Sequence, residues 1–182
     1  MSDLLPIELW KSAVLNPKET FAKEKKNASI MDGVKQLVVG GVIAGLLVGV
    51  LGLVGGNVLG VVVMPIMYAI LMPVGGLIGT GILWIVAKLL GGKGSYSAQY
   101  YVTALFAAPL AIPGAIPLVG LLVVLYELYL YVLMIKDVHE LDTLKAVIVV
   151  LAPLIILAIL AFLAFGAIIA LLGMRSLAGA GA

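Results

Sequence analysis

Long apolar runs separated by short polar connectors dominate this chain. Between Lys35 and Lys88 there are 52 consecutive positions without a charged residue. One membrane-spanning helix needs about 20 apolar residues, so this run is long enough for two spans and a turn. Gly55-Gly56-Asn57 marks that turn, and the pattern therefore predicts spans at about 34–54 and 62–90.

Three further apolar runs follow, and they predict spans at 97–112, at about 117–136 and at 144–173. The first two are at or below the usual length, so we expect a tight hairpin turned by Pro113-Gly-Ala-Ile-Pro117. The last span is long enough to tilt. Pro73, inside the 62–90 span, is expected to kink it, because proline removes a backbone hydrogen bond and crowds the preceding turn.

The first 33 residues differ from the rest because they carry five lysines and five acids and no early apolar region typical of a signal peptide. A helix over 5–15 would place five apolar residues near one face: Leu5, Leu9, Trp10, Ala13 and Val14. We expect this helix to lie at the membrane interface with Trp10 at headgroup depth. Residues 1–33 are therefore interpreted as a cytoplasmic amphipathic segment, with a dedicated partner-docking site as the alternative.

Composition supports a lipid environment. Hydrophobic residues make up 64% of the chain, charged residues 11%, and the mean hydropathy is +1.27, whereas a soluble domain is about half apolar and a quarter charged. The predicted fold class is an all-α polytopic integral membrane protein. It combines a five-helix transmembrane bundle (34–174) with an N-terminal interfacial helix and a short extracytoplasmic tail (175–182).

The distribution of positive charge predicts the orientation of the chain. The N-terminal segment, the 88–96 loop and the 136–145 loop hold all ten lysines, whereas the opposite side has Arg175 alone. Because lysine and arginine favour the cytoplasmic side, we expect a cytoplasmic N-terminus and an extracytoplasmic C-terminus. The net charge of +2 is too small to indicate a nucleic-acid partner.

Glycines recur every fourth residue in the first two spans. Residues at this spacing line one helix face and allow helix backbones to approach closely in lipid. The pattern predicts close packing within the bundle, and self-association of two copies through the same ridge is the alternative. The residues assigned to this packing are Gly41, Gly45, Gly49, Gly52, Gly56, Gly75 and Gly79.

Glu127 is the one acid inside an otherwise apolar span. It lies about ten residues from each end of the 117–136 span, near the bilayer midplane, where an acid is costly and marks a functional hypothesis. No lysine or arginine is expected at this depth, so desolvation favours the neutral acid. Three roles stay open: a protonated acid satisfied inside the bundle, a proton or cation relay, and a polar contact between protomers. Expected hydrogen-bond partners are Gln99, Thr103, Thr80 and Tyr131.

The sequence offers no catalytic or cofactor motif. His139-Glu140 cannot form a zinc-binding H-E-x-x-H pair, because the chain has one histidine. Leu90-Gly-Gly-Lys-Gly-Ser-Tyr96 lacks the spacing of a phosphate-binding loop and follows no strand. The absence of cysteine excludes disulfides, thiolate metal sites and cysteine nucleophiles. We therefore predict a protein that is not an enzyme and that binds no metal and no cofactor.

Charged and aromatic residues in the cytoplasmic segments suggest an alternative role in partner recognition. The 136–145 loop is of mixed sign, and Asp142 is expected to cap the last helix. Because the N-terminal helix, the 88–96 loop and this loop share one membrane side, a composite docking face is predicted there. Its assigned residues are Trp10, Lys93, His139, Glu140 and Lys145.

The order of several short motifs resembles the Yip domain family of five-span membrane proteins, first known as Ypt/Rab-interacting proteins. The matching pieces are Trp10…Asn16-Pro17…Phe21, Leu90-Gly-Gly-Lys-Gly-Ser-Tyr96, Ala108-Pro109…Ile116-Pro117, Leu128-Tyr129-Leu130 and Val138-His139-Glu-Leu-Asp-Thr-Leu-Lys145-Ala146. The resemblance implies a role in membrane traffic, with Rab-type GTPases and related membrane proteins as partners. The short N-terminal region resembles the prokaryotic branch, which implies the cell membrane as location.

Two functions from different classes are carried forward. The first is a non-enzymatic membrane organiser or adaptor that acts through helix packing, homo-oligomers or related membrane proteins, and a cytoplasmic protein partner. The second is a small transporter or channel component that uses Glu127. The predicted spans contain few polar side chains that could line a transport path, which favours the organiser.

Overall fold

The computed structural model describes the backbone of residues 7–179 and the side chains of residues 7–166. This part of the chain contains helices and no strand, which confirms the all-α fold class. The helices are α1 (Ile7–Leu15), α2 (Pro17–Glu24), η1 (Lys25–Asn27), α3 (Ile30–Gly52), η2 (Leu53–Gly55), α4 (Gly60–Leu89), α5 (Tyr96–Gly114), α6 (Val119–His139) and α7 (Thr143–Gly179). Leu5 and residues 180–182 of the predicted tail lie outside the described residues, and residues 175–179 belong to α7.

In the part of the chain that the structure describes, four helical segments are long and apolar enough to cross a membrane: Ile30–Gly55, Gly60–Leu89, Val119–His139 and Thr143–Gly166. They correspond to four of the five predicted spans, and α5 corresponds to the remaining one. The first half of α5 carries tyrosine, glutamine and threonine side chains that neighbouring helices bury. A fifth span therefore stays a prediction, because α5 lies at the centre of the bundle and is less apolar than the helices around it.

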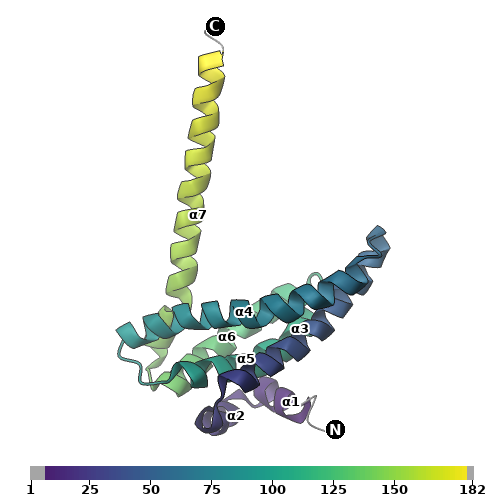
Figure 1. Ribbon diagram of the computed structural model, residues 1–182. Coiled ribbons are helices and arrows are strands. Elements are labelled where there is room, and N and C mark those ends of the chain that lie inside the picture. The colour runs from purple at the N-terminus through teal and green to yellow at the C-terminus, as the bar shows by residue number, and fades with distance from the viewer. Residues whose placement is uncertain (1–6, 180–182) are drawn as a thin grey trace.

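Helices α3 to α6 run back and forth beside one another, with α1 and α2 along one side (Figure 1). The α4–α5 loop and the α6–α7 corner lie at the same end of this bundle, which we call the loop end. The α5–α6 turn lies at the opposite end, which we call the hairpin end. Helix α4 continues through Pro65 and Pro73, so the kink predicted at Pro73 does not interrupt the helix.

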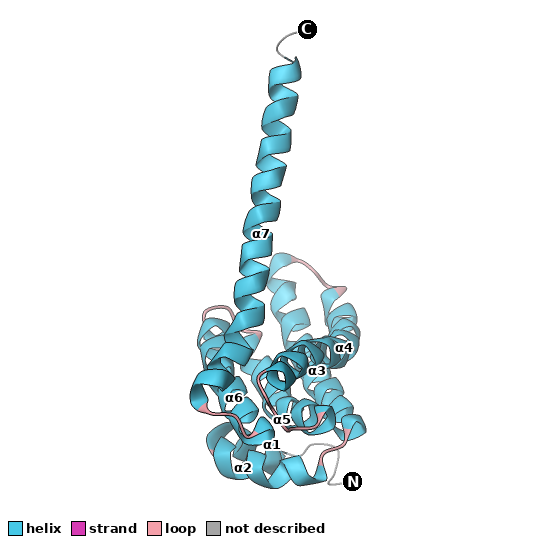
Figure 2. Cartoon of the chain, turned by 90° about the vertical axis from the view of Figure 1, so that its left-hand side faces the viewer, coloured by secondary structure: helices cyan, strands magenta, loops and turns pink. Residues whose placement is uncertain are grey.

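Helix α7 leaves the loop end at a steep angle to α4 (Figures 1 and 2). Its first turns pack against the bundle, where Ala146, Val149 and Val150 are buried. From Leu154 to Phe165 its large apolar side chains are exposed. The bundle thus contains α3–α6 and only the start of α7, and the exposed part is apolar on all sides, as lipid requires.

The N-terminal helices pack against the bundle instead of leaving their apolar face free for the membrane surface. Ala13 and Phe21 are fully buried, and the Phe21 ring lies 5.7 Å from that of Phe106 in α5. The Tyr126 hydroxyl of α6 donates to the Val14 carbonyl at 2.6 Å. The predicted amphipathic helix exists, but α5 and α6 cover its apolar side.

Candidate functional site

A chain of buried polar groups joins α4, α5 and α6 near the loop end. The Gln99 side-chain amide nitrogen donates to the Thr80 carbonyl at 3.1 Å, and its oxygen lies 2.7 Å from Nε2 of His139. Since the amide oxygen can only accept, His139 Nε2 is the donor. Both Gln99 and His139 are fully buried. This arrangement ties the C-terminal end of α6 to the start of α5.

The glycine-rich loop after α4 packs directly onto His139. A Cβ at Gly92 would lie 2.7 Å from His139 Nδ1 and 2.8 Å from the Ala87 carbonyl, and one at Gly94 would lie 2.6 Å from the Val138 carbonyl. The Lys93 amide donates to the His139 carbonyl at 3.1 Å. The Gly-Gly-Lys-Gly-Ser sequence therefore permits the close approach of this loop to the end of α6.

Ionic contacts connect three distant segments at the loop end. Lys93 Nζ lies 3.0 Å from a carboxylate oxygen of Glu140. Lys25 Nζ donates to the Asp137 carbonyl at 2.6 Å and lies 3.4 Å from the Asp137 carboxylate. The hydrogen bond from Lys93 lowers the pKa of the exposed Glu140 carboxyl below its ordinary value. The N-terminal segment, the glycine-rich loop and the α6–α7 corner thus form one composite surface.

The residues predicted for a docking face divide between this surface and the interior. Lys93, Glu140 and Lys145 are exposed. Trp10 is only 6% exposed and donates to the Gln36 side-chain oxygen at 2.5 Å, while His139 is fully buried. Trp10 and His139 therefore do not lie on an exposed face, because Trp10 Nε1 and His139 Nε2 bond to partners inside the protein. His139 Nδ1 is buried without a partner among the described residues.

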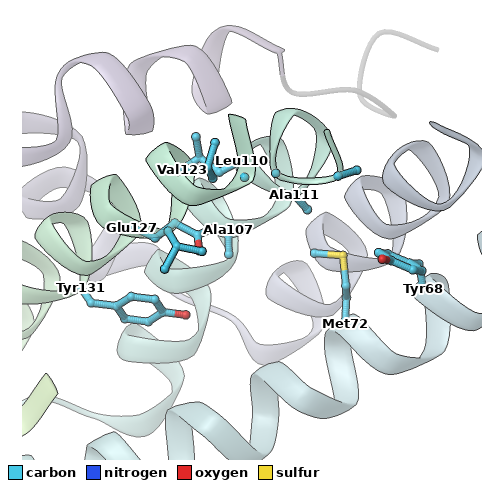
Figure 3. Close-up of a pocket in the computed structure, with 12 residues that line it drawn as sticks. Tyr68, Met72, Ala107, Leu110, Ala111, Val123, Glu127 and Tyr131 are labelled. Atoms are coloured by element: carbon cyan, nitrogen blue, oxygen red, sulfur yellow. The ribbon is translucent and has the colours of Figure 1, made fainter. Parts of the chain in front are cut away.

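Glu127 lines a cavity of about 300 Å³ between α4, α5 and α6 (Figure 3). Tyr68 and Met72 face the cavity from α4, Ala107 and Ala111 from α5, and Tyr131 from α6. The lining reaches Gly114 and Gly120 beside the α5–α6 turn, so the cavity extends from Glu127 toward the hairpin end. No lysine or arginine lines it.

The expected hydrogen-bond partners of Glu127 lie elsewhere, apart from Tyr131, which lines the same cavity. Gln99 bonds to His139 and Thr80, and the Thr80 and Thr103 hydroxyls have no partner among the described residues. The position of Glu127 along α6 explains why Gln99 does not reach it. Glu127 precedes His139 by twelve residues, which is roughly 18 Å along α6, so it lies far from the level of Gln99.

Of the seven glycines assigned to helix packing, some lie in a contact between helices and others face open space. A Cβ at Gly41, Gly45 or Gly49 would lie 2.5 to 2.6 Å from a backbone carbonyl of α4, so these three glycines form the α3–α4 contact. Gly52 approaches only Asn57, and Gly56, Gly75 and Gly79 have no neighbour within 4 Å of such a Cβ. Self-association through the exposed Gly75 therefore stays a prediction.

Sequence reasoning missed the pairing of Gln99 with His139, the fit of Gly92 and Gly94 against α6, and the position of Tyr68 in the cavity. One signal was present: the lone histidine and the glutamine of the adjacent span both lie near the same predicted membrane side. Within residues 7–166, no three His, Cys, Asp or Glu side chains gather as a metal ligand set.

These features define an all-α polytopic membrane protein with a buried polar core and a charged end. The chain belongs to the Yip1 domain family, whose model matches residues 11–166. The match begins inside α1, covers the bundle and ends at residue 166 in α7. It confirms the resemblance seen in the sequence. No curated protein and no solved structure matches the chain.

Proposed function

We propose that this protein is a non-enzymatic membrane organiser or adaptor. It acts by recruiting a partner at the loop end and by associating with copies of itself or with related proteins in the membrane. Membership of a family of non-enzymatic membrane proteins supports this proposal. We further propose that the loop end faces the cytoplasm, because the lysines lie in the N-terminal segment and at this end of the bundle.

The observation that carries the proposal is the composite surface at the loop end. Lys25–Asp137 and Lys93–Glu140 hold together three segments that are far apart in the sequence. The exposed Lys93–Glu140 pair contributes little to stability, so fixing it in one arrangement is more useful for recognition than for folding. The Lys25–Asp137 pair is half-buried and holds the N-terminal segment in place. The revised docking face consists of Lys93, Glu140 and Lys145, with Trp10 and His139 supporting it from inside.

Site-specific photocrosslinking in native membranes tests the docking face. A photoreactive amino acid at Lys93 probes the loop end, and the same amino acid at Leu118, which is 86% exposed, probes the hairpin end. We expect a discrete adduct from position 93 that is absent from position 118 and lost when Glu140→Lys is added. Equal adducts from both ends, or an adduct insensitive to Glu140→Lys, contradict the proposal.

Disulfide crosslinking tests self-association. Because the chain has no native cysteine, only an introduced cysteine can form a disulfide. Gly75→Cys introduces a thiol on an exposed face of α4, whereas Gly45→Cys introduces one at the α3–α4 contact. Self-association through this ridge predicts a covalent dimer for Gly75→Cys alone. A monomer from both variants under oxidising conditions rules out association through the α4 ridge.

The cavity beside Glu127 favours a second candidate function, a small transporter or channel component. The cavity combines an acid with space for a small molecule and reaches toward one end of the bundle. Flux assays in proteoliposomes test this alternative. A solute or proton flux that Glu127→Gln abolishes supports it, and flux equal to that of protein-free liposomes rejects it.

A further inference from the structure

Three polar side chains in the Glu127 cavity have no hydrogen-bond partner among the described residues: the Glu127 carboxyl group and the hydroxyls of Tyr68 and Tyr131. Four of the other five tyrosines are satisfied inside the protein, and the fifth, Tyr129, is exposed. Tyr96 donates to the Leu77 carbonyl and Tyr100 to the Pro73 carbonyl. Tyr126 donates to the Val14 carbonyl and Tyr101 to the Glu24 carboxylate. The fully buried polar atoms without a partner lie elsewhere, at Thr80, Thr103, Asp137 and His139. The three cavity groups are only partly buried, so a molecule in the cavity can reach them and use their hydrogen-bonding capacity.

The rest of the cavity wall is apolar, and its size suits a small molecule. Met72, Leu110 and Val123 are among the side chains that surround the three polar groups. A volume of about 300 Å³ is at the lower limit of ligand pockets. It corresponds to roughly ten water molecules by volume. An occupant should therefore have a short apolar body and one polar end.

Charge and ring geometry define that polar end. Within residues 7–166, no cation lines the cavity, and Lys136 on the same helix is nine residues from Glu127, roughly 13 Å away. The wall of the cavity therefore supplies no counter-charge for an ionised Glu127, whereas a cationic ligand would. The rings of Tyr68 and Tyr131 line the same space, and aromatic faces attract ammonium groups.

We propose that this cavity binds a small amphiphilic amine, with its nitrogen at Glu127 and its alkyl or aryl body along α5 toward the hairpin end. The amine enters from the lipid as the neutral base and accepts the proton of the neutral carboxyl group. The resulting ammonium and carboxylate form an ion pair, so no net charge crosses the apolar surroundings. The inference holds whether or not the ligand is transported, and it does not depend on the docking face.

Equilibrium binding of radiolabelled octylamine to the full chain in phosphatidylcholine nanodiscs tests the proposal. Empty nanodiscs give the amount of amine that partitions into lipid, and 1-octanol serves as the neutral probe of the same length. We expect saturable octylamine binding above the empty-disc level, at one site for each chain. Octanol is expected to compete at least tenfold more weakly than unlabelled octylamine.

Two variants separate the charge from the space. Glu127→Gln preserves the shape of the side chain and is expected to weaken octylamine binding at least tenfold while leaving octanol unchanged. Ala111→Leu, which removes no polar group from the cavity, is expected to abolish binding of both probes by filling the space. Ile78→Ala, on an exposed part of α4 outside the cavity, serves as the control with unchanged binding.

Several results overturn the proposal. The first is the absence of saturable octylamine binding to the unmodified chain. The second is unchanged octylamine affinity in both folded cavity variants, with folding checked by thermal unfolding. The third is equal affinity for octanol and octylamine, which identifies a site for neutral amphiphiles. If Glu127→Gln does not fold, the Ala111→Leu variant and the comparison of octanol with octylamine decide whether the cavity binds an amine. Failure of the amine proposal leaves the photocrosslinking and disulfide tests of the proposed function unaffected.

Discussion

His139 Nε2 donates a 2.7 Å hydrogen bond to the Gln99 side-chain oxygen inside the bundle, joining residues 40 positions apart in the sequence. Because α5 and α6 are antiparallel, this contact fixes which residues of the two helices face each other. Twelve residues further from the loop end on each helix, Glu127 and Ala111 line the same cavity. The position of the acid in the bundle is thus linked to a polar contact roughly 18 Å away.

Removing the glutamine from this pair should destabilise the protein. Gln99→Leu leaves the buried His139 Nε2–H without an acceptor, and an unsatisfied buried donor costs about 1–3 kcal/mol. We expect a corresponding fall in the free energy of unfolding, measured by denaturant titration in detergent. The double variant Gln99→Leu/His139→Leu should lose less than the sum of the two single changes, because neither polar partner is left alone.

Thr103→Val is the matched control for this experiment. It lies on the same helix, one turn from Gln99, and its buried hydroxyl has no hydrogen-bond partner among the described residues. Replacing that hydroxyl with a methyl group should leave stability unchanged or raise it. A loss as large as that of Gln99→Leu shows that any change on this helix face is harmful, which contradicts a specific role for the hydrogen bond.

The α3–α4 contact predicts opposite effects for two glycine substitutions. In Gly45→Ala the new Cβ would lie 2.5 Å from the Met64 carbonyl and 2.6 Å from the Pro65 Cα, so the helix backbones must separate. We expect a loss of about 1–3 kcal/mol in the free energy of unfolding, as for other overpacked interiors. In Gly75→Ala no atom lies within 4 Å, and alanine favours a helix over glycine by about 1 kcal/mol.

Thermal unfolding of both variants in the same detergent measures this difference. Gly45→Ala should melt below the unmodified protein, and Gly75→Ala at or above it. If Gly75→Ala lowers the melting temperature more than Gly45→Ala does, the exposed face of α4 around Gly75 forms a contact between copies of the protein. Similar melting temperatures for all three proteins mean that α3 and α4 do not pack through Gly45.

The Lys93–Glu140 pair predicts a measurable change in acidity. The hydrogen bond from Lys93 lowers the Glu140 pKa, so Lys93→Gln should raise that pKa toward its ordinary value. Because the Glu140 pKa is lower in the folded state than in the unfolded state, the pair contributes to the free energy of unfolding at pH values above the unfolded-state pKa. This contribution is lost as pH falls through the folded-state pKa. The pair is exposed, so added salt should weaken its effect.

Carbon-detected NMR of the Glu140 carboxyl group as a function of pH measures this pKa. Lys145→Gln is the control, because Lys145 is exposed and forms no ion pair with Glu140 among the described contacts. It should leave the Glu140 pKa close to that of the unmodified chain. A Glu140 pKa that does not respond to Lys93→Gln shows that the two side chains do not meet in solution.

The membrane class and the four long apolar helices were predictable because lipid accepts only long apolar segments with satisfied backbones. The predicted span at 34–54 overlaps α3 and η2, and the turn at Gly55-Gly56-Asn57 lies between η2 and α4. Asp142 caps α7 as expected, with the Lys145 amide donating to its carboxylate at 2.9 Å. These features depend on local sequence, which explains why the pattern was sufficient.

Helix register and side-chain partners were not predictable from the same pattern. In a membrane protein, lipid-facing and protein-facing positions are both apolar, so periodicity does not show which helix faces which. Gln99 was therefore assigned to Glu127, although His139 at the same end of the bundle is its partner. The steep departure of α7 has no local signal either, because its sequence is apolar on every side.

The N-terminal helices give the remaining test, because their amphipathic pattern does not show what covers the apolar face. Trp10 packs beside Leu37 and Tyr100 and donates to Gln36. In the single-tryptophan variant Trp84→Phe, we expect Trp10 fluorescence to resist both aqueous acrylamide and lipids brominated near the headgroup. Trp84, observed in the variant Trp10→Phe, is half-buried and should be quenched more strongly. Equal quenching of the two tryptophans means that α1 lies free at the membrane surface, as the sequence alone suggested. The contacts of Trp10 with α3 and α5 would then not persist in the bilayer.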